Sequence, residues 1–204
     1  SIYGQASNSS GYTKERSRIL IKFPVTGTTS IKADRTAGIL PASGSVSFYL
    51  NLYNAVTPFT LPKQFTLNLY ALDQSWTEGN GLDMESYKDI GASNWIDRLE
   101  QTTWEITGAT FQNTASTAPW KANGYFENGD ENLSVDITPY VESWVKGTGG
   151  GGFENYGFLV AFTPTEESAS QSYYDKKFFA RSSEYFFQRP TIEARWDNTN
   201  NDDR

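Results

Sequence analysis

The sequence predicts an all-β protein, an antiparallel β-sandwich with one short helix packed on it. Apolar and polar residues alternate with a period of two over residues 46–53 and 65–71, which is typical of half-buried strands. Turn residues recur at short intervals between such stretches, and one segment has the apolar spacing of a helix. With 204 residues, 37% of them apolar and 15% aromatic, the chain has enough apolar material for a full core.

The chain is predicted to form one domain over residues 17–196. Residues 1–16 are polar and Ser-rich, so we expect an arm, or an edge strand at Ile2 and Tyr3. Residues 197–204 form a solvated tail. The expected strands within the domain cover residues 17–23, 46–53, 65–71, 104–111, 133–137, 157–162 and 192–196. The strand at 157–162 is apolar on both faces, which predicts a central position in a sheet.

Residues 133–162 organise this fold as strand, short helix, glycine loop and strand. We expect the helix at about 139–146, with the Thr138 hydroxyl capping its start and Gly147 ending it. Its apolar residues fall at i, i+3 and i+4 and form one stripe: Val141, Trp144 and Val145. A helix this short is stable only when that stripe packs on a sheet, so these three residues are predicted to be a structural plug.

Motifs in this order resemble those of a known family. They are SRILIKF at 17–23, DIT at 136–138, FFARSSE at 178–184 and RPTIE at 189–193, with further matches at Val141, Trp144, Gly147, Asn155 and Gly157. Together they resemble the DNRLRE domain family, which is related to carbohydrate-binding modules and similar to jelly-roll β-sandwiches. The resemblance implies a jelly-roll topology for the predicted sandwich.

Residues 73–101 form a long polar excursion that carries three candidate interface aromatics, Trp76, Tyr87 and Trp95. Loops this long in a compact domain are usually functional or form interfaces. The stretch resembles versions of the domain in structural proteins of tailed bacteriophages. This resemblance implies a non-enzymatic virion protein (a capsid decoration, neck, tail or fibre component) that contacts other virion proteins. Symmetric copies would supply a homo-oligomeric interface, with residues 1–16 and 73–101 as contact surfaces.

A second interpretation is a carbohydrate-binding module for a cell-surface or capsular glycan, which would place the protein outside the cell. Tyr49, Tyr53 and Tyr70 lie opposite the apolar sets of their strands and would form an exposed ribbon for stacking sugar rings. Tyrosines of a core or an interface explain the same pattern.

A calcium ion is the one cofactor that the sequence suggests. The loop around Glu127, Asp130 and Glu131 is rich in oxygen ligands, although acidic turns are also common on any soluble surface.

Composition removes several classes of function. Without histidine or cysteine, the chain has no Ser-His-Asp or Cys-His mechanism. Carboxylates such as Glu78, Asp83 and Glu85 are candidates for cleaving a glycosidic bond, but nothing in the sequence sets their separation, so no enzyme is predicted. The net charge of -7 disfavours nucleic acid, and no apolar run approaches a membrane span.

Overall fold

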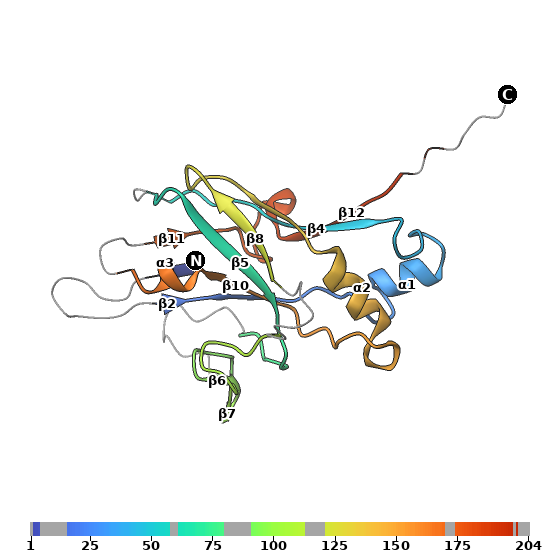
Figure 1. Ribbon diagram of the computed structural model, residues 1–204, viewed down its shortest axis with the longest axis horizontal. Helices are drawn as coiled ribbons and strands as arrows, with labels where there is room; N and C mark the ends of the chain where they lie inside the picture. The colour runs from blue at the N-terminus through green and yellow to red at the C-terminus, as the bar shows by residue number, and fades with distance from the viewer. Residues whose placement is uncertain are drawn as a thin grey trace. The chain divides into compact units, whose positions relative to one another are not determined.

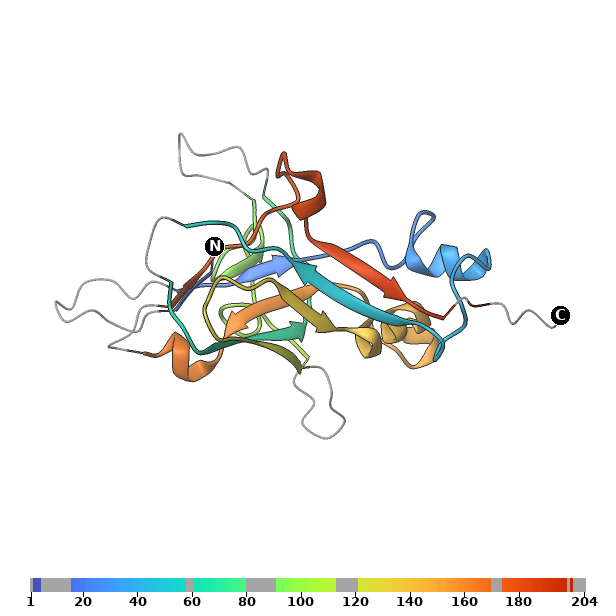
Figure 2. The same ribbon diagram turned by 90° about the horizontal axis from the view of Figure 1, so that it is seen from above.

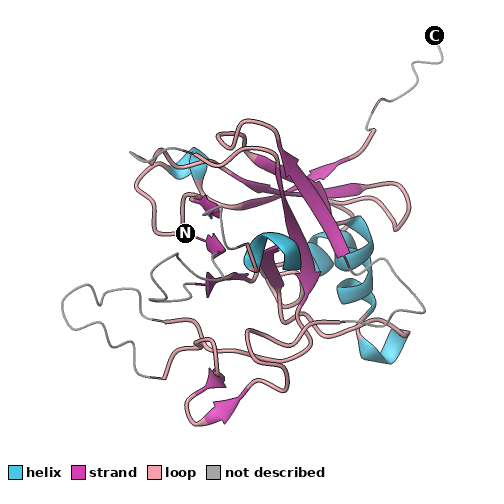
Figure 3. Ribbon diagram, turned by 60° about the vertical axis from the view of Figure 1, so that its left-hand side comes forward, coloured by secondary structure: helices cyan, strands magenta, loops and turns pink. Residues whose placement is uncertain are grey.

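A computed structural model describes residues 2–4, 16–57, 61–79, 91–112, 121–169, 174–197 and 199. The predicted fold class is confirmed, because antiparallel strands account for 32% of the chain and helices for 16% (Figures 1 and 3). This composition is compatible with an all-β sandwich carrying a short helix. Contacts divide the chain into two compact units. Unit 1 is Ser1–Lys22, Thr57–Gly129 and Tyr156–Lys177, and unit 2 is Phe23–Val56, Asp130–Asn155 and Phe178–Arg204.

Unit 1 is built on a four-stranded antiparallel sheet. Its order is β3 (Ile19–Ile21), β10 (Phe158–Phe162), β5 (Phe65–Ala71) and β8 (Lys121–Phe126). Every residue of β10 is buried, and the strand lies between β3 and β5, which confirms the predicted central position. Apolar side chains on both of its faces are therefore covered.

A second sheet of unit 1 has three short strands, β11 (Tyr174–Lys176), β1 (Ile2–Gly4) and β2 (Arg16–Ser17). The strand expected at Ile2 and Tyr3 is present as β1, at the centre of this sheet rather than at its edge. The hairpin of β6 (Asp97–Leu99) and β7 (Thr102–Thr103) lies within and just after the polar excursion.

The strand predicted over 104–111 is wrong. Gly108 and Ala109 have φ values of 86° and 89°, which a continuous strand cannot contain, and only Phe111 makes a bridge, to Leu72. The elements that were not predicted include β8 and the short helix α3 (Pro164–Glu167).

Unit 2 contains a three-stranded antiparallel sheet in the order β12 (Thr191–Arg195), β4 (Ser47–Leu52) and β9 (Leu133–Asp136). The period-two pattern of β4 buries Phe48, Leu50 and Leu52 on one face, as predicted. The unit also has two 3₁₀ turns, η1 (Thr148–Gly150) and η2 (Phe186–Gln188), and α1 (Ile31–Thr36), which the sequence did not predict. Ser30 begins α1, where its hydroxyl accepts from the Ala33 N–H.

The predicted plug helix is α2 (Thr138–Lys146). Val141 and Trp144 are buried as predicted, but Val145 is half-buried and Tyr140 is buried in addition. The predicted cap is wrong: the Thr138 hydroxyl accepts from the Phe48 N–H at 2.8 Å, so it ties α2 to β4 instead of capping the helix.

Gly147 ends α2 with a φ of 66°, a conformation that favours glycine, as predicted. Across the described ranges, no helix is both long and apolar enough to span a membrane.

Candidate functional site

A cavity of about 360 Å³ in unit 1 collects two of the predicted aromatic residues. Trp76 and Trp95 line it together with Trp104, and the remaining lining includes Arg16 and Arg18. This volume lies within the range of small-ligand pockets, which combine apolar walls with a few polar groups. We call this cavity the tryptophan pocket. Tyr87, the third predicted aromatic of the excursion, lies outside the described residues.

Hydrogen bonds to the main chain hold two of the three indoles in place. Trp76 donates its Nε1–H to the Tyr156 carbonyl at 2.8 Å, and Trp104 donates to the Asn94 carbonyl at 3.0 Å. A buried indole N–H needs such a partner, and the partner fixes the ring orientation. The walls of the pocket are therefore preformed.

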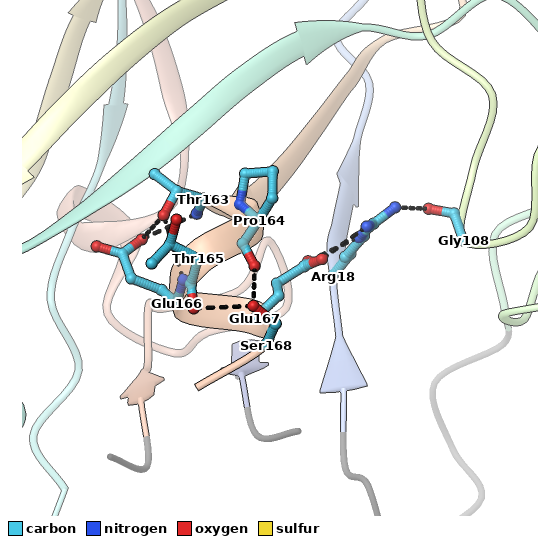
Figure 4. Close-up of polar contacts among 8 residues, drawn as sticks. All are labelled: Arg18, Gly108, Thr163, Pro164, Thr165, Glu166, Glu167 and Ser168. Atoms are coloured by element: carbon cyan, nitrogen blue, oxygen red, sulfur yellow. Dashed lines mark hydrogen bonds and ion pairs between the residues drawn. The ribbon is translucent and has the colours of Figure 1, made fainter. Parts of the chain in front are cut away.

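Arg18 ties three separate segments of unit 1 together at the pocket (Figure 4). Its Nε and Nη2 donate to the two carboxylate oxygens of Glu167 at 2.8 and 2.7 Å, and its Nη1 donates to the Gly108 carbonyl at 2.6 Å. The guanidinium also lies over the Trp95 ring, 4.8 Å from its centroid. We call this arrangement the Arg18 clasp.

Gly108 is required by the clasp for two reasons. Its φ of 86° favours glycine, and a Cβ there would lie only 2.8 Å from Arg18 Nη1 and 3.0 Å from the Trp95 ring. Another residue would strain the backbone and push the guanidinium off the ring.

The short helix α3 places Glu167 for the clasp. It begins with a capping box, in which the Thr163 hydroxyl accepts from the Glu166 N–H and the Glu166 carboxylate accepts from the Thr163 N–H (Figure 4). Pro164 occupies the first turn, where no N–H is needed. Glu167 is thereby buried with its carboxylate turned toward Arg18.

The described lining of the tryptophan pocket carries positive charge. Its described residues include two arginines and no carboxylate, although the chain as a whole carries a charge of -7. Glu167 balances Arg18, whereas Arg16 is exposed and has no ion-pair partner among the described residues. Glu78 is exposed, and the other two carboxylates considered for glycosidic cleavage, Asp83 and Glu85, lie outside the described residues.

The three tyrosines of the predicted ribbon are divided between the two units. Tyr70 stacks on Phe111 with ring centroids 4.3 Å apart and packs against the core of unit 1, and burial raises the pKa of its hydroxyl. Tyr49 and Tyr53 belong to unit 2, where the Arg195 guanidinium lies 3.9 Å from the Tyr49 ring centroid. Tyr70 is therefore packed within its unit, one face of Tyr49 is covered by Arg195, and the ribbon stays a prediction.

The candidate calcium loop shows no group of acidic ligands among its described residues. Among the residues with described positions, no three Asp, Glu, His or Cys side chains come together as metal ligands, so Glu127, Asp130 and Glu131 do not form such a group. The Glu127 carboxylate instead accepts hydrogen bonds from Gln64 and Tyr125.

Unit 2 presents three successive exposed aromatic residues that the sequence analysis did not identify as a surface. Tyr185, Phe186 and Phe187 are 57%, 67% and 88% exposed. Three aromatic residues in direct succession indicate that at least one of them is exposed, because neither a strand nor a helix places three consecutive side chains on one face. The turn η2 is stabilised by Arg189, which donates to the Ser183 carbonyl at 2.8 Å and lies over the Phe186 ring. We call residues 185–187 the aromatic segment.

Comparison of the chain with protein-family models, curated proteins and solved structures found no match. The resemblance to the DNRLRE domain family therefore stays a prediction.

Proposed function

We propose that this protein is a non-enzymatic structural component of a tailed-phage particle and acts through protein–protein contacts. The phage context is supported by the ordered motifs that resemble the DNRLRE domain family and by the likeness of residues 73–101 to phage versions of that domain. The contact role is supported by one structural observation, the exposure of the aromatic segment.

The aromatic segment has the physical properties of a contact site. Burying a Phe side chain is worth roughly 1.5–3 kcal/mol, so leaving two of them in water forgoes a large stabilisation. Adjacent exposed aromatics on soluble proteins mark interaction sites, and aromatic anchors dominate the energy of many interfaces. Arg189 and Ser183 hold the backbone of this segment, so little conformational entropy is lost on docking.

Particle incorporation tests this proposal directly. In phage carrying the Phe186→Ser and Phe187→Ser substitutions, we expect the amount of this protein in purified particles to fall at least about tenfold, since the loss of one aromatic anchor commonly costs 2 kcal/mol or more. Quantitative mass spectrometry of purified particles measures the amount.

A matched control replaces an isolated exposed apolar residue of the same unit. Ile39 is 66% exposed, and Ile39→Ser should leave incorporation unchanged. The contact role is refuted if the doubly substituted protein is incorporated at the level of the unsubstituted one. The phage assignment is refuted if the unsubstituted protein is absent from particles.

The tryptophan pocket supports a second candidate function, glycan binding. Sugar rings stack on indoles, and the Asn94, Ser93 and Arg16 side chains at the lining can exchange hydrogen bonds with hydroxyl groups. The pocket is preformed, which lowers the entropic cost of binding a sugar.

An array of bacterial polysaccharides, followed by calorimetric titration of the strongest hit, tests glycan binding. Trp76→Ala should weaken a genuine hit at least about tenfold, since removing a stacking aromatic anchor typically costs more than 1 kcal/mol. Trp196→Ala, an exposed tryptophan outside the pocket, is the control. Equal losses in both variants, or no hit, would exclude the pocket as the glycan site.

A further inference from the structure

Strand β12 forms an open edge of the sheet in unit 2. It pairs with β4 on one side, and no described residue pairs with its other side (Figure 2, β12 red beside β4 cyan). In an antiparallel ladder every second residue directs its N–H and C=O away from the partner strand. An open edge therefore presents unpaired backbone groups that can accept another strand.

The apolar face of this edge is incompletely covered. Ile192 and Ala194 lie opposite Leu50 and Phe48 of β4, which are fully buried, yet both residues of β12 are only half-buried. Trp196 follows directly after the strand and is 40% exposed. An additional strand paired with β12 would place its own side chains beside these three and cover them.

The opposite face carries two charges of opposite sign. Glu193 and Arg195 form an ion pair at 2.7 Å, Asn51 donates to the Glu193 carboxylate, and Arg195 lies over the Tyr49 ring. Both charged side chains are nearly half-exposed, at 44% and 49%. They are held on the sheet and stay accessible to another molecule.

Geometry limits how two β12 strands can pair. Only every second residue of β12 directs its backbone N–H and C=O toward the open edge. A two-fold axis that passes between two residues would set such a residue opposite one whose groups point toward β4, and the two could not pair. The axis must therefore pass through a residue. An axis through Glu193 would place like charges directly opposite each other, which destabilises a strand pair.

An axis through Ala194 produces complementary pairs on both faces. Glu193 then lies opposite Arg195 of the second copy, and by symmetry this pair occurs twice. On the apolar face, Ile192 lies opposite Trp196 of the second copy, so each side chain covers the other. Opposite charges and apolar–aromatic pairs are favourable cross-strand combinations.

We propose that two copies of this protein associate through antiparallel pairing of their β12 strands about a two-fold axis at Ala194. The pairing joins two three-stranded sheets into one of six strands. The contact is isologous, as expected of a symmetric homodimer. It deepens the proposed function, on which it rests for its context, because a particle component present in symmetric copies needs a self-complementary surface.

Charge reversal tests the register in the full chain. The substitutions Glu193→Arg and Arg195→Glu each place like charges opposite one another, and we expect each to weaken self-association at least about tenfold, because two cross-strand pairs change from attraction to repulsion. An equimolar mixture of the two variants restores opposite charges in both pairs, so a heterodimer should form. Analytical ultracentrifugation across protein concentrations measures association, and circular dichroism checks the fold of each variant.

A cysteine cross-link gives an independent measurement, because the chain has no cysteine of its own. In the proposed register Ala194 lies opposite itself, with a Cα–Cα distance of about 4.5–5.5 Å, which a disulfide spans. Ala194→Cys should form a covalent dimer on mild oxidation. Thr191→Cys is the control, because its two copies would lie about 20 Å apart.

The outcomes separate this inference from the proposed function. The register is overturned if each charge-reversed variant still dimerises as the unsubstituted protein does. It is also overturned if cysteines at positions 191 and 194 cross-link equally. The association itself is overturned if the unsubstituted protein is a monomer at all concentrations. Incorporation into particles by a protein that never pairs through β12 would overturn this inference alone. A dimer that cross-links at Ala194 but is absent from particles would overturn the phage assignment alone.

Discussion

Two arginine–glutamate pairs, one in each unit, show how the same chemistry takes different roles. Arg18–Glu167 in unit 1 and Arg195–Glu193 in unit 2 have the same closest approach of 2.7 Å. The exposed fractions of their side chains are 20% and 8% for the first pair, and 49% and 44% for the second. The first pair joins residues 149 positions apart, and the second joins residues two apart.

The difference separates structural support from an accessible surface. Arg18 satisfies a buried carboxylate, a backbone carbonyl and an indole face at once, so its loss leaves several groups without a partner. Arg195 and Glu193 lie in water, where the solvent replaces whatever is removed. We therefore expect substitutions in the first pair to change folding stability, and substitutions in the second to change association.

The largest expected effect is that of Arg18→Ala. Removing one partner of a buried pair leaves an uncompensated charge on Glu167, and we expect the free energy of unfolding to fall by about 3–5 kcal/mol. Urea denaturation followed by circular dichroism measures it. Arg16→Ala, a neighbouring exposed arginine of the same pocket, should change stability little. Equal losses in both variants would contradict the distinction between the pairs.

A second buried pair, Arg35–Glu142 of unit 2, should show a smaller effect when only the charge of its glutamate is removed. Its side chains are 15% and 14% exposed, and Arg35 donates two hydrogen bonds to the carboxylate at 2.8 and 2.7 Å. We expect Glu142→Gln to cost about 1–3 kcal/mol at neutral pH. Denaturation of both proteins under identical conditions measures the difference.

The same pair predicts a pH dependence. Burial raises the pKa of Glu142, but hydrogen bonds from Arg35 and Ser43 outweigh burial and hold it below its ordinary value of 4.5. The stabilisation is therefore complete above pH 4.5 and is lost as the pH falls through the lowered pKa. The stability difference between the unsubstituted protein and Glu142→Gln should shrink over that acid range. A constant difference would show that Glu142 does not titrate as described.

The smallest effect on folding is expected for Arg195→Ala, because both partners of that pair are in water. At a protein concentration at which both proteins are monomeric, the midpoint of denaturation should not change measurably. Hydrogen bonds from Arg195 and Asn51 lower the pKa of Glu193 to about 2, so the substitution should raise it toward 4.5. An NMR titration of the Glu193 carboxylate reports this change, and an unaltered pKa would show that the pair is not formed in solution.

Local sequence patterns predicted the strands and the helix whose side chains are buried at a regular period. The alternation in β4 and the i, i+3, i+4 spacing in α2 follow directly from the geometry of a strand and a helix. The pattern failed at β8, whose Asn123 and Gly124 are typical of turns, because pairing with β5 overrides their local preference. It also failed at 104–111, where Gly108 and Ala109 have positive φ values that a continuous strand cannot contain.

The candidate site was only partly predictable. Trp76 and Trp95 were identified because large aromatics in a polar excursion are costly to leave in water. Arg18, which packs on the Trp95 ring, and Glu167, which pairs with Arg18, were not identified, because both lie far from Trp95 in the sequence. The aromatic segment was likewise not identified as a surface, because exposure depends on what the rest of the fold covers.

The sequence by itself determined the strands and the plug helix whose side chains are buried with a regular period, such as β4 and α2, because that period depends on neighbours within a few residues. Only the tertiary structure decided which charges pair in a buried environment, which indoles share a cavity and which aromatic side chains face solvent. These properties depend on contacts between residues as many as 149 positions apart, and no local pattern encodes such contacts.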